Sequence, residues 1–323
     1  MTRKLLFAAT AALAISSCTM QEVDDVAATP REPIRFEQFV GKATRAGDVT
    51  NESLTKFFVF GRTIPQNGEP KEIKITATKS GDTWTYSGKT MYWEEGTKYY
   101  FAATNWESTT FDEGTSPEDY AIISSSFTPR RGLDVITASP TVITGQATGN
   151  APVSFNFKHA LAKVQFTFVN EYKDYNVNLM EISLTKIWTD DNFTQKIGEA
   201  LCAWGRSGSQ GWWAFDRDIN FTQAGTSETS PNFFIPQSLA DVKLVFDLDA
   251  SKSNELFNIS KSYSLPLSTD EISEWQPGHV YNYKVTIKPD SSETEDPEAI
   301  EFKVNVTDWS DTTEAGSIES EVK

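Results

Sequence analysis

The chain has 323 residues, of which 38% are apolar and 23% charged, and its formal net charge is −16. A chain of this length holds about two domains, and this composition excludes an intrinsically disordered protein. The acidic balance argues against nucleic acid and anionic membrane surfaces as electrostatic partners, because both carry negative charge. The 21 Phe, 10 Tyr and 9 Trp favour β-sheet, where aromatic side chains pack well.

The first 17 residues have the pattern of an export signal. Two basic residues precede an apolar stretch, residues 5–15, that is too short to span a bilayer as a permanent helix. Two serines then precede Cys18, and this arrangement resembles a bacterial lipobox. The resemblance implies cleavage before Cys18 and acylation of its thiol, for example with palmitate. An ordinary secretory signal with a chance cysteine is the alternative.

Cysteine usage limits the chemistry of the exported chain. If Cys18 carries lipid, Cys202 is the one other cysteine, so no intramolecular disulfide can form. Zinc sites that need several cysteines are excluded by the same count. We expect no metal and no cofactor.

Residues 18–33 are polar and acidic, and we interpret them as a tether. The next stretch, "IRFEQFV" at 34–40, is a predicted strand. Ile34, Phe36 and Val40 lie on one face at period two, with Gln38 as the exception on that face. A thin connector with Gly on both sides of Arg45 follows this strand.

From about residue 53 the chain is a series of predicted strands separated by turn signals. Residues 71–88 alternate apolar and polar side chains on both sides of Ser80-Gly81-Asp82, which predicts a hairpin. Further alternating stretches are "VSFNFK" at 153–158, "VQFTF" at 164–168, "VKLVFDL" at 242–248, "YNYKVTI" at 281–287 and "IEFKVNV" at 300–306.

These strands predict an all-β fold of two tandem antiparallel sandwiches, because each alternation gives one wetted and one buried face. We place the division in the Gly-, Thr- and Pro-containing stretch at 143–152. The predicted N-terminal domain is 34–150, with 34–45 as its first strand and connector. The predicted C-terminal domain is 151–323.

Four stretches, taken in order after a lipobox, carry a family resemblance. They are "WTYSGKTMYWEEGTKYYFAAT" at 84–104, "VSFNFKHALAKVQFTF" at 153–168, "EWQPGHVYNYKVTI" at 274–287 and "VNVTDWSD" at 304–311. Together they resemble the fimbrillin-like (Mfa-like) proteins of Bacteroidetes over nearly the whole exported chain. The resemblance implies a type V pilus component with two transthyretin-like β-sandwich domains, carried to the outer membrane as a lipoprotein.

The family also implies an assembly mechanism. A trypsin-like or arginine-specific protease cuts a loop after the first strand, and a strand from a neighbouring subunit fills the groove left behind. On this chain Arg45 is the expected cleavage site, Ala46 the new N-terminus, and Ile34, Phe36 and Val40 the side chains of the exchanged strand. The alternative is a first strand that stays paired, with Arg45 in a solvated loop.

The resemblance implies that the C-terminal segment of a stalk subunit supplies the strand that fills a neighbour's groove, and in this chain that segment is a weak donor strand. Residues 310–323, "SDTTEAGSIESEVK", are polar and acidic, with Ile318 and Val322 as their apolar points. This favours an accessory, tip-like or anchoring subunit.

No catalytic constellation is present, so we expect no enzyme. His159 lies between predicted strands with no nucleophile placed beside it, and we interpret it as a structural contact. A secreted hydrolase is a further alternative that lacks such a constellation.

Trp204, Trp212 and Trp213 surround a Gly- and Ser-rich turn. They would either contact a glycan through exposed aromatic faces or cap a sandwich core. The glycan alternative corresponds to a monomeric surface lipoprotein that binds glycan or host protein.

Overall fold

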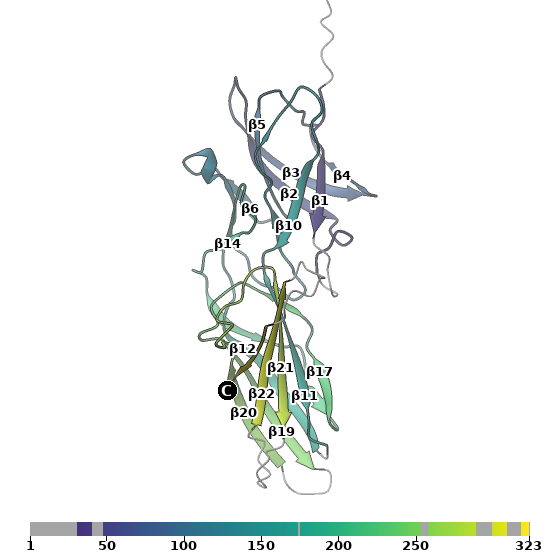
Figure 1. The fold of residues 1–323 in the computed structure, drawn as a ribbon, viewed down its shortest axis with the longest axis vertical. Coiled ribbons are helices and arrows are strands. Elements are labelled where there is room, and N and C mark those ends of the chain that lie inside the picture. Colours follow the sequence, from purple (N-terminus) through teal and green to yellow (C-terminus); the bar gives the residue numbers. More distant parts are fainter. Residues whose placement is uncertain are drawn as a thin grey trace, which may run out of the picture.

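The computed structural model describes residues 31–40, 48–173, 175–252, 258–288, 299–308 and 318–322. Within these ranges the chain is almost entirely β, and the prediction of an all-β sandwich fold is confirmed. One 3-10 turn, η1 (Pro117–Asp119), is the one helical element of the described residues. The molecule is elongated, with the early strands at one end and the late strands at the other (Figure 1).

The strands before residue 160 are β1 (Phe36–Val40), β2 (Lys56–Ile64), β3 (Lys71–Ser80), β4 (Thr83–Tyr86), β5 (Lys98–Thr104), β6 (Thr109–Asp112), β7 (Ala121–Ser124), β8 (Ile136–Ala138), β9 (Ile143–Thr144) and β10 (Val153–His159). The later strands are β11 (Ala162–Asn170), β12 (Tyr175–Trp188), β13 (Phe193–Lys196), β14 (Ala203–Trp204), β15 (Gln210–Ala214), β16 (Ile219–Phe221), β17 (Gly225–Glu228), β18 (Asn232–Phe234), β19 (Lys243–Lys252), β20 (Asn258–Pro266), β21 (His279–Lys288), β22 (Ala299–Asp308) and β23 (Ile318–Val322).

The N-terminal sheet has the order β1-β10-β8-β5-β2-β3-β4, with β9 also paired to β5. The predicted hairpin is β3–β4, and Gly81 in its turn has a φ of 60°. Glycine has no Cβ, so it adopts this left-handed conformation at little cost. One face of the sheet carries an aromatic core that includes Phe57, Phe101 and Phe155.

The central strand β2 is buried on both faces because a second sheet covers it. Phe57 and Val59 face the aromatic core, while Phe58 and Phe60 contact Ile122 of β7. That second sheet has the order β14-β13-β7-β6, so it joins strands from both halves of the sequence.

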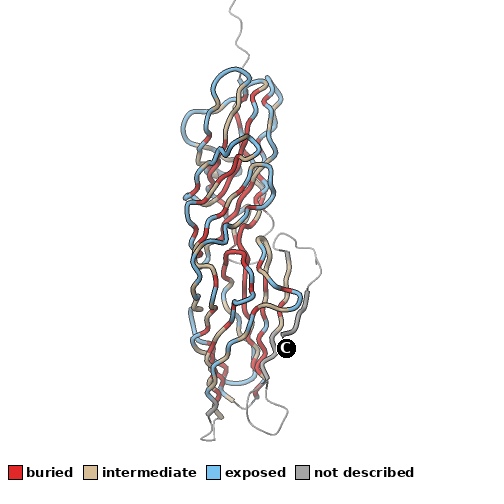
Figure 2. The backbone as a smooth tube through the Cα atoms, turned by 90° about the vertical axis from the view of Figure 1, so that its left-hand side faces the viewer, coloured by how far each residue is buried: buried red, intermediate tan, exposed pale blue. Residues whose placement is uncertain are grey.

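The C-terminal half is a sandwich of two sheets. One has the order β17-β11-β21-β22-β23, with β18 also paired to β11, and the other has β15-β12-β19-β20, with β16 paired to β12. Alternate side chains of β11, β12, β19 and β21 fill the space between the sheets. Figure 2 shows the result as buried segments inside and exposed loops outside.

Two features differ from the sequence-based expectation. The sheets are not purely antiparallel, because β1 pairs parallel with β10 and β11 pairs parallel with β21. In addition, β10 still belongs to the N-terminal sheet, although the expected division lies before it. The chain passes between the sheets at residues 160–161, where Ala160 and Leu161 are buried in a separate apolar cluster. The turn-rich stretch at 143–152 therefore contains the short strand β9 and the connection from it to β10 within the first sheet, since turn signals mark loops of any kind.

Candidate functional site

Strand β1 ends the N-terminal sheet among the described strands, and it pairs with β10 alone (Figure 1). The pairing is parallel, with Phe36 opposite Val153 and Val40 opposite Phe157. Because parallel partners on neighbouring strands face the same side, the alternate residues of β1 point into the same core as those of β10. Ile34, Phe36 and Val40 are 2%, 4% and 0% exposed.

The residues just before β1 are held from the other side of the core. The Ile34 amide donates to the Met91 carbonyl at 2.9 Å, and the Tyr86 hydroxyl donates to the Ile34 carbonyl at 3.1 Å. The Val153 amide donates to the Arg35 carbonyl at 2.8 Å. The segment at 34–40 therefore contacts β10 on one side and Tyr86 and Met91 on the other.

Phe36 contacts three aromatic rings of the core. Its ring centroid lies 5.5 Å from that of Tyr86, 5.9 Å from that of Phe101 and 5.8 Å from that of Phe155. Aromatic pairs at such distances contribute about 0.5–1.5 kcal/mol beyond the area they bury. The first strand is therefore an integral part of the core.

Glu32, which precedes this segment, also holds it in place. The Glu32 carboxylate accepts hydrogen bonds from the amide and the side chain of Asn150 at 2.9 and 3.0 Å. The hydrogen bond from the Asn150 side chain is the main cause that lowers the pKa of Glu32, and the bond from the Asn150 amide lowers it further.

The connector between β1 and β2 is anchored at both ends. At its upstream end the Val40 amide donates to Asn51 Oδ1 at 2.6 Å. At its downstream end Asp48 Oδ1 lies 2.6 Å from Lys163 Nζ, and the Val49 amide donates to Asp134 Oδ2 at 3.0 Å. The expected cleavage site, Arg45 and Ala46, lies outside the described residues.

His159 belongs to this anchored region. Its Nδ1 lies 2.8 Å from Asp134 Oδ2, and both side chains are almost fully buried. The same carboxylate oxygen accepts from Val49, so His159 is part of a buried polar contact at the junction of the two halves. No local sequence pattern indicates the Asp48–Lys163 pair, because its members are 115 residues apart.

The three tryptophans lie in different environments. Trp204 packs against Phe127 and Phe193, and its Nε1 donates to the Ala160 carbonyl at 2.8 Å. Trp213 is half-buried and contacts Phe234 in the C-terminal core. Trp212 is 69% exposed. Trp204 and Trp213 thus contribute to packing, and Trp212 alone of the three presents its ring to solvent.

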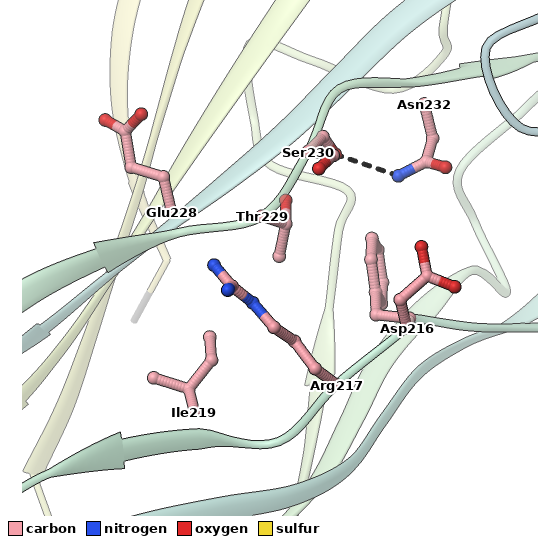
Figure 3. A pocket seen from close by; sticks show the side chains of 8 residues that line it. Asp216, Arg217, Ile219, Glu228, Thr229, Ser230 and Asn232 are labelled. Carbon is pink, nitrogen blue, oxygen red and sulfur yellow. Dashed lines mark hydrogen bonds between the residues drawn. The ribbon is translucent and has the colours of Figure 1, made fainter.

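Two hollows share the segment 215–217 as part of their lining, and Trp212 lines one of them. One, of about 550 Å³, is lined by Trp212, Glu181, Asp218 and others. The other, of about 230 Å³, lies between this segment and residues 228–232. Figure 3 shows Arg217 extending from one wall of the smaller hollow toward Thr229, with the Ser230–Asn232 hydrogen bond nearby.

Cys202 is the one cysteine among the described residues, and it is buried. Burial raises the pKa of the Cys202 thiol to about 12, so it stays protonated at neutral pH. Within the described ranges, no three His, Cys, Asp or Glu side chains are grouped so as to hold a metal ion. No helix of the described residues has the length and apolarity that a bilayer span requires. Cys18 and the signal segment lie outside the described residues.

Comparison with known proteins places this sequence in a family. The sequence model of the fimbrillin-like family matches residues 44–309. No curated protein matches the chain.

Solved structures that resemble this chain come from Bacteroides and Parabacteroides species. A candidate cell adhesion protein from Bacteroides ovatus ATCC 8483 is 14% identical, with a TM-score of 0.50, over 86% of this chain and 98% of that one. One from Bacteroides uniformis ATCC 8492 is 16% identical, with a TM-score of 0.49, over 86% and 99%. A fimbrial assembly protein from Parabacteroides distasonis ATCC 8503 is 16% identical, with a TM-score of 0.43, over 85% and 98%. Because the family match covers most of the sequence, this chain belongs to the fimbrillin-like family.

Proposed function

We propose that this chain is a structural or accessory subunit of a surface pilus, assembled by strand exchange after proteolytic cleavage at Arg45. Its family makes it a pilus- or adhesin-type protein of the cell surface. The observation that carries the finer proposal is the position of β1. This strand supplies buried core residues, yet it pairs with a single described strand and is joined to the rest by one short connector.

Cleavage changes the thermodynamics of β1 without removing any of its contacts. In the intact chain the pairing of β1 with β10 is intramolecular, so the connector gives β1 a high effective concentration at its groove. A cut after Arg45 removes this advantage, and β1 then competes with any other extended segment. An incoming strand would form main-chain hydrogen bonds with β10 and place alternate side chains in the same pockets.

The anchored ends of the connector support this order of events. Asp48 is fastened to Lys163 and Val49 to Asp134, so the chain downstream of a cut keeps its place. Upstream, the Arg35 backbone is hydrogen-bonded to Val153 in extended form, which protects it from proteases that need locally open chain. Arg45 therefore remains the preferred arginine for a productive cut.

The proposed partners follow from this mechanism. They are other pilus subunits, an arginine-specific or trypsin-like protease, and the outer membrane through a lipid on Cys18. The chain's own C-terminal strand β23 pairs antiparallel with β22 within the same molecule. This intramolecular pairing, together with the acidic sequence of the tail, supports an accessory, tip or anchoring role over a stalk role.

Limited digestion with an arginine-specific protease tests the proposal. A lipid-free variant should be cut once at Arg45, release the segment before Ala46, and form SDS-resistant ladders. The Arg45→Ala variant is the matched control and should remain intact and monomeric. If both variants give the same products and neither polymerises, the strand-exchange mechanism is wrong.

A second candidate function, glycan or host-protein binding, is favoured by the exposure of Trp212. An exposed indole can stack on a sugar ring, and the adjoining hollows offer carboxylate, guanidinium and hydroxyl groups for its polar edge. Glycan-array binding that disappears in Trp212→Ala would support it. Tyr92→Ala is the control, because Tyr92 is an exposed aromatic at 42% on the N-terminal half.

A further inference from the structure

Strand β1 carries one polar residue on its core-facing side. Residues 34, 36, 38 and 40 share that side, and three of them are nearly fully buried apolar residues. The fourth, Gln38, is half-buried, and its Oε1 is buried without a hydrogen-bond donor among the described residues.

The surroundings of Gln38 are apolar on the core side. Its register partner on β10 is Phe155, which is 0% exposed and stacks with Phe36 at 5.8 Å. A buried amide oxygen that accepts no hydrogen bond loses its water without compensation, which disfavours the state that contains it. An apolar side chain of similar size at this point has no such desolvation cost.

There is also room beside this position. A hollow of about 600 Å³ lies beside β1. Most of the side chains that line it are polar or charged, Gln38, Asn51 and Lys79 among them, and Phe36 and Trp84 are part of its apolar lining. A larger or branched apolar side chain at position 38 therefore has room in this hollow, which Trp84 also lines.

We propose that Gln38 is a weak point of β1 that makes the strand displaceable, and that the segment which replaces β1 carries an apolar side chain at the Gln38 position. This inference rests on the proposed strand exchange, and it specifies the chemistry of the partner. The partner is an extended segment of another subunit with apolar residues at four successive alternate positions. The native first segment has apolar residues at three of these four positions, so the replacing segment binds the same groove more tightly than β1 does.

The first test uses the uncut protein and does not depend on exchange. Gln38→Leu should raise the midpoint of thermal unfolding, whereas Glu37→Leu should not, because Glu37 is exposed on the opposite face of the same strand. Gln38→Met, which keeps the unbranched shape of the side chain, guards against a misfit of the branched leucine. Equal midpoints for wild type, Gln38→Leu and Gln38→Met would overturn the inference.

The second test uses protein cut at Arg45. Release of the segment before Ala46, followed by mass spectrometry, should be about tenfold slower for Gln38→Leu than for wild type. A synthetic peptide "IRFELFV" should displace the native strand at about one tenth of the concentration that "IRFEQFV" requires. Equal potency of the two peptides would contradict the inference.

The two proposals fail in different ways. If the cut wild-type protein never releases its first segment, the proposed exchange is wrong. The comparison of unfolding midpoints then still decides whether Gln38 weakens the packing of β1 against the core.

Discussion

Lys163 Nζ lies 2.6 Å from Asp48 Oδ1, and both side chains are shielded from solvent. Asp48 follows the connector of the N-terminal half, while Lys163 is on β11 of the C-terminal sandwich. A buried ion pair is costly to break one partner at a time, because the remaining charge stays buried without compensation. The pair therefore holds the start of the chain that follows the proposed cut against the opposite half of the molecule.

Breaking this pair should destabilise the protein strongly. We expect Asp48→Asn to lower the free energy of unfolding by about 3–5 kcal/mol, because Lys163 keeps its charge in the interior. The measurement is chemical denaturation followed by fluorescence. Asp48→Asn combined with Lys163→Met should recover part of the loss, and a strictly additive double variant would argue against a coupled pair.

Phe36→Ala should reveal whether β1 stays in its groove after cleavage. In the uncut protein the substitution should cost about 3–5 kcal/mol of unfolding free energy, as for other buried aromatic residues. In protein that has been cut at Arg45 and left to exchange, the same substitution should have no effect, because the segment that carries it has left; a loss that persists after the cut would mean that β1 stays in its groove. Glu37→Ala, on the exposed face of β1, is the control and should be nearly neutral in both states.

Two tryptophan variants should behave oppositely. Trp204→Ala removes a ring packed between Phe127 and Phe193 and the hydrogen bond to Ala160, so it should cost about 3–5 kcal/mol. Trp212→Ala should change stability by less than about 0.5 kcal/mol, because the side chain is mostly in solvent. Thermal unfolding of the two variants measures the difference. A large loss of stability in Trp212→Ala would contradict its assignment as a surface residue.

Cys202 should make stability fall at high pH. Its pKa is raised by burial from 9.0 to about 12, so the folded state keeps the proton that the unfolded state loses above pH 9. The stability that the protonated Cys202 thiol contributes to the folded state is thus fully present below pH 9. It is lost as pH rises toward 12, by at most about 1.4 kcal/mol per pH unit. Denaturation between pH 8 and 10 should show a flatter slope for Cys202→Ala than for wild type.

The thiol of Cys202 should also resist modification. In the native protein at pH 8, with Cys18 absent, a thiol reagent should react slowly, and denaturant should restore full reactivity. Rapid labelling of the native protein would mean that the site opens locally.

The sequence by itself determined the local structure of this protein. The alternation of Ile34, Phe36 and Val40 predicted a strand with one buried face, and the Ser80–Asp82 turn predicted the β3–β4 hairpin. Such features depend on the period-two geometry of extended backbone and on the conformations that glycine allows, so neighbouring residues suffice to encode them. The order of the aromatic stretches also carried the family resemblance, which the family match confirms.

The tertiary structure alone decided which distant segments meet. Nothing local to residues 36–40 specifies a parallel partner at 153–157, or places Asp48 against Lys163. Likewise, three tryptophans near one turn look alike in sequence, yet one is exposed and two contribute to packing. The physical reason is that pairing and burial are settled by how all the apolar faces cover one another, a property of the whole chain and not of any one segment.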